Sequence, residues 1–320
     1  MPGFITHYIC GQAALKAADQ NVQKIIKPYE QFYNIGTQGP DIFFYYIPGL
    51  VFKPTLRDIG IHMHHHSFGD FMTNMLDTLF ADEILANVKT RNLIFAYISG
   101  FLTHYALDAV AHPYVYSQTG IRKKTDKASV KIKYSVDHRK FETAIDSIML
   151  NSLASKTPTN SKLWQLIKVD KNPANIIAET VSSAVSESYS RNIIPKDVYN
   201  AMRYMMNFTR AMQFFNGRKN RFKQLLENLT INESLFLNAN VDFSVDYMNL
   251  EHVPWSIPGI ETKNESFVEL YNDALQQSSE LIDSVWRCIN GEISRQVLTA
   301  IIGDRSLSTG ITADVSPVVI

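Results

Sequence analysis

Apolar residues along most of the chain recur at steps of three and four residues, which is the spacing of one face of an α-helix. In residues 71–85 one stripe is formed by Met72, Met75, Leu76 and Leu79. In residues 266–289 the stripe is formed by Phe267, Leu270, Tyr271, Ala274 and Leu281. Ser266 precedes that second stripe in the position of a helix N-cap. Alternating strand patterns are scarce, so we predict an all-α fold of roughly ten helices.

Side chains of the kind that bind metal ions occur at helical spacing in two short segments. HYALDAVAH contains His104, Asp108 and His112, and DHRKFE contains His138 and Glu142. Residues four apart share one face of a helix, so each segment can direct its ligands into one space between helices. Zinc accepts imidazole nitrogens and carboxylate oxygens, and two helices offer more of them than one ion needs. The spacing therefore predicts a cluster of metal ions that carries out hydrolysis.

The distribution of histidines argues against a simpler interpretation as core histidines and surface charge. Seven of the nine histidines lie before residue 113, four of them in HMHHH at residues 62–66. No helix or strand can point all four in the same direction. We expect at least one of them to join the metal cluster and the others to be solvated loop residues. Pro113 follows HYALDAVAH, and we expect it to end that helix.

Composition narrows the class of protein. Basic and acidic residues balance at 31 each, so nucleic acid is a less favoured partner. The two cysteines are far apart in the sequence and form neither a disulfide framework nor a paired metal motif. The start of the chain has no basic leader followed by an apolar run, and the longest apolar runs, 42–52 and 93–103, are too short to span a bilayer. We therefore expect a cytoplasmic, unsecreted protein without a transmembrane segment.

Clusters of Pro, Gly, Ser and Asn mark breaks but are too short to be linkers between separate domains. We predict one helical domain over residues 1–320. Its metal-binding half covers residues 1–155 and a supporting helical half covers residues 156–302, with the SKTPTNS segment at 155–161 between them. The helical pattern is lost at residues 303–320, which predicts a loosely held tail.

Together with their flanking residues, these motifs resemble the zinc-dependent phospholipase C family. The resemblance is based on MPGFITHY, GTQGPDIFFYY, DIGIHMH, HYALDAVAHPYVY and DHRKFE, which occur in this order. A further stretch, from NLEHVPWSIP through ESFVELYNDAL, is similar to the intracellular, unsecreted branch of that family. The resemblance extends from residue 1 to about residue 285, and it implies an all-α fold.

The resemblance also implies two to three zinc ions and a ligand set for each. The first ion would bind Asp41, His64, His104 and a bridging Asp108. The second would bind His112, His138 and Glu142. The third would bind His7, Asp108 and the α-amino and carbonyl groups of the mature N-terminal residue. Secreted members begin with Trp and place five residues between the bridging Asp and the next His, whereas this chain begins Met1-Pro2 and has three.

The activity implied is phospholipase C-type cleavage of a phospholipid by metal-activated hydroxide, with Asp41 as the candidate catalytic base. Two other functions remain open, a zinc-dependent single-strand nuclease on a related scaffold and a non-catalytic metal- or lipid-binding protein. The aromatic residues in 42–52 could enclose a quaternary ammonium headgroup or belong to the core. The basic run at 121–133 could make a peripheral membrane contact or be a solvated loop.

Overall fold

The computed structural model describes residues 3–46, 56–66, 68–121, 126–153, 163–216, 241–242 and 244–312. In the first part of the chain, the helices are α1 (Phe4–Ala17), α2 (Gln20–Ile26), η1 (Lys27–Tyr29), α3 (Glu30–Gly36), η2 (Gly39–Tyr45), α4 (Arg57–His65), α5 (Phe68–Leu79), α6 (Asp82–Ala86) and α7 (Val88–Thr119). They are followed by α8 (Ala128–Leu153), α9 (Leu163–Leu166), α10 (Lys171–Tyr189), α11 (Pro195–Asn216), α13 (Phe267–Ile289) and α14 (Arg295–Ile302). The described residues contain no strand and only two isolated β-bridges, so the predicted all-α fold is confirmed.

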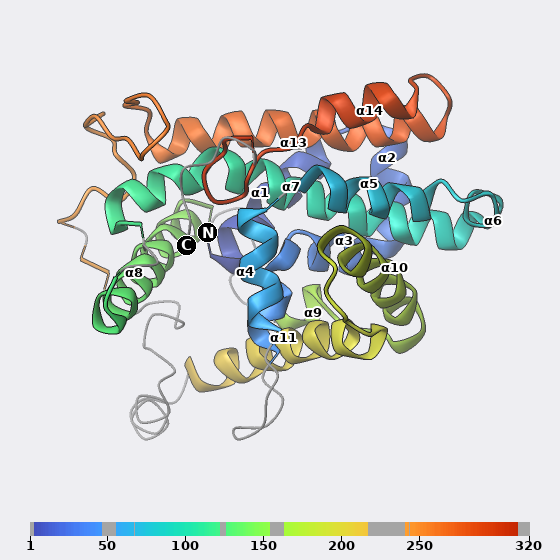
Figure 1. Cartoon of the computed structure of the whole chain (residues 1–320), viewed down its shortest axis with the longest axis horizontal. Coiled ribbons are helices and arrows are strands. Elements are labelled where there is room, and N and C mark those ends of the chain that lie inside the picture. The colour runs from blue at the N-terminus through green and yellow to red at the C-terminus, as the bar shows by residue number, and fades with distance from the viewer. Residues whose placement is uncertain are drawn as a thin grey trace.

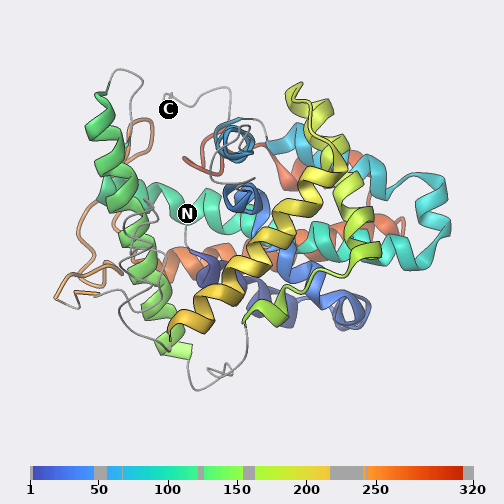
Figure 2. The same ribbon diagram turned by 90° about the horizontal axis from the view of Figure 1, so that it is seen from below.

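The long helix α7 is the centre of the fold. It packs against α13 on one side and α3 on another, and α8 crosses its C-terminal end (Figures 1 and 2). By length and composition α7 could cross a membrane, but its apolar window is wholly buried inside the protein. The prediction that Pro113 ends this helix is wrong, because α7 continues to Thr119. Burial of the following residues, Tyr114 to Tyr116, outweighs the hydrogen bond that the proline lacks.

Two glycines bring α3 and α7 into backbone contact. A Cβ on Gly36 would collide with the carbonyl oxygen of Tyr97, and a Cβ on Gly100 would collide with that of Tyr33. Only glycine permits so close an approach of two helices. This contact sets the position of Thr37, at the end of α3, relative to the α7 residues that follow Gly100.

Two helices predicted from periodicity differ in how well they match the structure. Residues 266–289 form α13 as predicted, and Ser266 begins it with a capping box in which its side chain and that of Glu269 bond each other's backbone N–H groups. Residues 71–85 are divided between α5 and α6, with a break at Phe80 and Ala81. Asp82 and Glu83 lie in the first turn of α6, where acidic side chains favour a helix start.

The tail that the sequence predicts to be loosely held differs from that expectation over residues 303–312. Ser306, Leu307, Ser308 and Thr309 are each at most 1% exposed, and the segment lies against α4 and α7. The segment is held by hydrogen bonds from its own side chains and backbone, which do not depend on helical periodicity. Residues 313–320 and the whole of the predicted SKTPTNS boundary lie outside the described residues.

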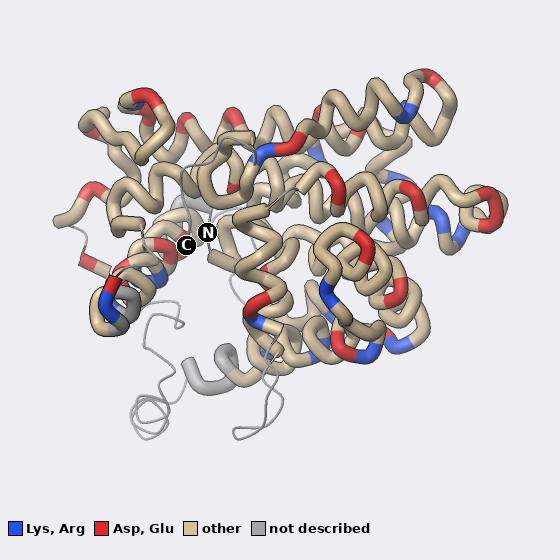
Figure 3. The backbone as a smooth tube through the Cα atoms, viewed as in Figure 1, with Lys and Arg blue, Asp and Glu red and all other residues tan. Residues whose placement is uncertain are grey.

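Charged residues of both signs are interspersed along the outer helices, and Figure 3 shows no large single-sign region on the part of the chain that the structure describes. This agrees with the balance of 31 basic and 31 acidic residues. Three carboxylates among the described residues are exceptions to this surface placement, since Asp41, Asp108 and Asp146 are all buried. Buried carboxylates require partners. Asp41 and Asp108 are predicted metal ligands, and Asp146 bonds the backbone next to a third, His7.

Candidate metal centre

The structure places all eight predicted metal ligands in one region where five helical elements meet. They come from α1, η2, α4, α7 and α8, whose packing is visible in Figures 1 and 2. Their side-chain atoms form three groups in which every ligand atom lies within 4.8 Å of the others: His7, His104 and Asp108; Asp41, His64 and His104; and His112, His138 and Glu142. Each group could hold a metal ion.

Asp108 connects the first two groups because its two oxygens face different histidines. Oδ1 lies 3.3 Å from Nε2 of His7, and Oδ2 lies 3.2 Å from Nε2 of His104 and 3.6 Å from Nε2 of His64. Burial raises the pKa of the Asp108 carboxyl, but His104 and His7 outweigh that effect and hold the pKa well below its usual range. Asp108 is therefore a carboxylate positioned to bridge two cations.

Backbone carbonyls determine how the histidines of these two groups are oriented. Nδ1 of His64 donates to the carbonyl oxygen of Gly60 at 2.6 Å, and Nδ1 of His104 donates to that of Thr37 at 3.2 Å. A carbonyl can only accept, so Nδ1 of each ring carries a proton, and the neutral form of each ring has its lone pair on Nε2. Both Nε2 atoms face Asp108. Metal-binding histidines are commonly oriented in this way.

The third group shows the same arrangement. Nδ1 of His112 donates to the carbonyl of Leu307 at 3.0 Å. The hydroxyl of Thr119 donates to Val115 and so accepts from Nδ1 of His138, at 3.0 Å. The two Nε2 lone pairs then face each other at 3.1 Å, and Oε1 of Glu142 lies 2.8 Å from Nε2 of His138. Three electron-rich atoms at this separation repel one another unless a cation or proton lies between them.

Unpartnered polar atoms show that the first two groups suit a metal ion. Among the described residues, Nε2 of His7, His64 and His104, Oδ1 of Asp41 and both carboxylate oxygens of Asp108 are buried without a hydrogen-bond partner. Leaving such atoms unsatisfied costs about 1–3 kcal/mol each, and more for charged groups. Nitrogen and oxygen donors in this combination are those that zinc accepts. The donor set therefore fits zinc.

The TQGPD segment places Asp41 beside His64. Gly39 has a positive φ of 49°, and a Cβ there would collide with the ring of His104. Pro40 follows in the first turn of η2, where its fixed φ is compatible with a helical start. Oδ1 of Asp41 consequently lies 3.4 Å from Nε2 of His64. The tight turn is thus part of how this ligand is positioned.

Asp146 is a site residue that our sequence analysis missed. It is buried on α8, and its carboxylate accepts hydrogen bonds from the backbone N–H groups of Ile5 and Thr6 and from the Thr6 hydroxyl. These bonds attach the start of α1, and therefore His7, to the helix that carries Glu142. Burial raises the pKa of Asp146 to about 6. Its spacing could have revealed it, since Asp146 follows His138 and Glu142 at four-residue steps.

Residues 62–65 of the HMHHH segment are helical, so the prediction of loop histidines is wrong for His62 and His65, whereas His66 follows the end of α4 and is exposed. His64 is the member that α4 directs inward, with an exposed fraction of 3%. His62 and His66 are four residues apart, and their rings stack on each other with their centres 3.8 Å apart. Neither belongs to a ligand group. The local sequence could not identify the inward residue, because that depends on how α4 packs against η2.

Replacing His62 by Gln is expected to make stability less dependent on pH. Burial, His66 and Arg191 lower the pKa of His62 to about 4, from 6.5. Its contribution to stability is therefore complete above pH 6.5 and is lost as the pH falls toward 4, because the unfolded chain then binds the extra proton. Thermal unfolding at about pH 7 and about pH 4.5 measures the difference. If wild type and His62→Gln lose the same Tm between the two pH values, the prediction is contradicted. His252→Gln is the control, because the His252 side chain is exposed.

The aromatic and basic runs have mixed roles. Phe43 is part of the core, whereas the ring of Phe44 lies 5.7 Å from that of His64. Residues 47–52 of the aromatic run and 122–125 of the basic run lie outside the described residues. Lys133, at the end of the basic run, is exposed and pairs with Asp137 at 2.8 Å. Asp137 is therefore a surface charge rather than a partner of His138.

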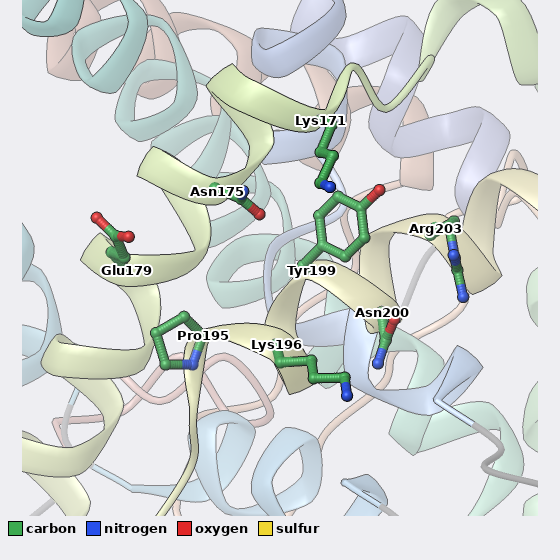
Figure 4. Close-up of a pocket in the computed structure, with 8 residues that line it drawn as sticks. All are labelled: Lys171, Asn175, Glu179, Pro195, Lys196, Tyr199, Asn200 and Arg203. Atoms are coloured by element: carbon green, nitrogen blue, oxygen red, sulfur yellow. The ribbon is translucent and has the colours of Figure 1, made fainter.

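A separate groove of about 730 Å³ lies between α10 and α11. Figure 4 shows its lining, in which Lys171, Lys196 and Arg203 accompany Glu179 and Tyr199. None of the predicted metal ligands lines it. The groove is therefore a polar surface feature apart from the metal centre.

Comparison with known proteins gives one match. A model of the family described as zinc dependent phospholipase C matches residues 6–193, which is more than half of the chain. The matched range contains all eight predicted ligands and ends just after α10. Searches of curated proteins and of solved structures found no match.

Proposed function

Because the chain belongs to the zinc-dependent phospholipase C family, we propose that it is a zinc-dependent phosphodiester hydrolase that cleaves a phospholipid in the manner of a phospholipase C. The observation that carries this proposal is the set of three ligand groups, with Asp108 between two of them. Nitrogen and oxygen ligand atoms converge there in a largely buried space, and four of the five histidines use Nδ1 to bond groups outside it. A purely structural core would not leave the Nε2 atoms of His64 and His104 and both oxygens of Asp108 buried without a hydrogen-bond partner.

We propose two to three zinc ions. Asp41, His64, His104 and Asp108 would hold one ion, and His112, His138 and Glu142 would hold a second. A third would use His7 and Asp108 together with a group from the start of the chain, but Met1 and Pro2 lie outside the described residues. Zinc in such clusters supplies Lewis-acid activation of water and neutralises the oxygens of a phosphodiester.

The protein's own residues would orient the ions and transfer a proton. Asp41 is the proposed catalytic base, because its Oδ1 has no hydrogen-bond partner and can accept a proton from the attacking water. It retains an exposed fraction of 7%, in contrast to the fully buried Asp108. Asp108 would hold its charge between His7 and His104 throughout. The carbonyls of Gly60, Thr37 and Leu307 would keep the imidazoles in one orientation.

A phospholipid is the proposed substrate. Phe44 lies beside His64 and is only half-buried, and the guanidinium carbon of Arg57 lies 5.6 Å from the centre of the Phe44 ring. An aromatic face and a cation next to the ligand groups suit a headgroup that combines a phosphate with an organic cation. Peripheral contact with a membrane would bring such a substrate to the site.

Zinc content and product analysis together test the function. We expect two to three zinc ions per chain by plasma mass spectrometry, on protein purified without an affinity tag or chelator. The same protein should release diacylglycerol and a phosphorylated headgroup from phosphatidylcholine vesicles. Cleavage of single-stranded DNA without lipid hydrolysis would replace the proposal with a nuclease. Bound zinc with no hydrolysis of either substrate would indicate a non-catalytic binding protein.

A further inference from the structure

The segment at residues 303–312, here called the C-terminal turn, contacts the metal centre although it lies far outside the matched range 6–193. It follows α14 directly and lies beside α4 in both views, as the red segment in Figures 1 and 2. Its central residues are almost fully buried. A segment without helical pattern, buried at this place, calls for an explanation beyond general packing.

The first contact is with the end of α4. The carbonyl of His64 is among the last four of that helix, which have no partner within the helix. It accepts a hydrogen bond from the Ser306 hydroxyl at 3.0 Å and another from the backbone N–H of Ser308 at 3.1 Å. The backbone of a predicted zinc ligand is thus held by the C-terminal turn.

The second contact is with the side chain of His112. Its Nδ1 donates to the carbonyl of Leu307 at 3.0 Å, which leaves Nε2 unprotonated and directed toward His138. Leu307 itself has an exposed fraction of 0%, so water does not compete readily for this carbonyl. The C-terminal turn therefore selects both the orientation and the tautomer of a second predicted ligand.

The conformation of the C-terminal turn is itself closely determined. The Ser306 hydroxyl accepts from the backbone N–H groups of Ser308 and Thr309. Gly310 has a positive φ of 68°, and a Cβ there would collide with the carbonyl oxygen of Ala109, the residue after Asp108. Tyr105, on α7, donates from its hydroxyl to Ile302 and accepts from the backbone of Arg305. These bonds determine where the carbonyl of Leu307 lies.

We infer that the C-terminal turn is a positioning element of the metal centre, acting through His64 and His112 on two different ligand groups. Ser306 is the positioning side chain, because one hydroxyl both holds the carbonyl of His64 and shapes the turn that presents Leu307. The inference rests on the proposed binding of zinc, but not on any particular substrate. It assigns a role in zinc binding to residues that the family match does not cover.

Ser306→Ala tests the inference when zinc affinity is measured by competition with a chelator. Loss of a group that orients a metal ligand typically weakens metal binding by about 10–100-fold, and we expect a change of that size. The visible spectrum of the Co²⁺-loaded protein should also change, since it reports the geometry of the ligands. Ser294→Ala is the matched control, because Ser294 caps α14 nearby and bonds no ligand. We expect it to lower Tm while leaving zinc affinity and the Co²⁺ spectrum unchanged.

Gly310→Ala provides a second, independent perturbation, since it displaces the turn from α7 without removing any polar group. It too should weaken zinc binding in protein that is folded by circular dichroism. Unchanged zinc affinity in both folded variants would overturn the inference. Failure of the wild type to hydrolyse phospholipid would refute only the proposed function, because the zinc measurements do not depend on turnover. A wild-type protein that binds no zinc would overturn both.

Discussion

Asp108→Asn is expected to abolish hydrolysis and to remove the metal ions of the first two ligand groups. The amide keeps the size of the side chain but has no negative charge and only one acceptor oxygen. It therefore cannot bridge an ion held on the side of His7 and an ion held on the side of His104 and His64. Even residues that only orient a ligand cost about 10–100-fold in metal affinity, and a shared ligand should cost more. Metal content by plasma mass spectrometry should fall to at most the ion held by His112, His138 and Glu142.

The matched control for Asp108 is Asp137→Asn. That carboxylate also lies on a helix, but it pairs with Lys133, is partly exposed and lies outside the ligand groups. Surface ion pairs of this kind contribute about 0–1 kcal/mol, so zinc content and hydrolysis should remain those of the wild type. Full metal content in Asp108→Asn would show that this residue is not a shared ligand.

His104→Ala should lose most bound metal as well, since His104 belongs to both of the first two groups.

Gly100→Ala is expected to lower the free energy of unfolding by about 4 kcal/mol or more, because the new methyl group meets backbone rather than a movable side chain. The nearest atoms are the carbonyl oxygen of Tyr33 and the amide nitrogen of Thr37. Separating α3 from α7 would also move the carbonyl of Thr37 away from Nδ1 of His104. Chemical denaturation measures the first effect, and the zinc content of the remaining folded protein measures the second.

Gly291→Ala separates this collision from the ordinary effect of replacing a glycine. Gly291 has a positive φ of 73°, but a Cβ there meets nothing within 4 Å. Backbone strain alone should cost about 1–2 kcal/mol and leave zinc content unchanged. If Gly100→Ala is no more destabilising than Gly291→Ala, the close contact of α3 and α7 does not have the importance assigned to it.

The helical fold and part of the metal centre could be predicted because they depend on local spacing. His104, Asp108 and His112 lie on one face of α7, and His138 and Glu142 on one face of α8, as their four-residue steps indicate. That each set shares one helix face follows from helix geometry alone. For these five residues, the sequence and the structure therefore carry the same information.

The remaining ligands depend on tertiary packing, which spacing cannot predict. His7, Asp41 and His64 come from three separate elements, and only the family resemblance selected them. Local sequence predicts that Pro113 ends a helix that in fact continues, because it does not reveal the burial of the residues beyond the proline. Nor could it show that the carbonyl of Leu307 bonds a side chain on α7, since any residue could supply that carbonyl.

The position of the C-terminal turn in the chain imposes an order on the assembly of the centre during synthesis. The ribosome makes Ser306 about 160 residues after Glu142, an interval of roughly 8–30 seconds at ordinary translation rates. During that interval His112 and His64 lack the bonds from the turn, and the space between α4 and α7 that the turn later occupies is not yet filled. Newly made chains thus contain all eight candidate ligands before the bonds that orient His64 and His112 can form.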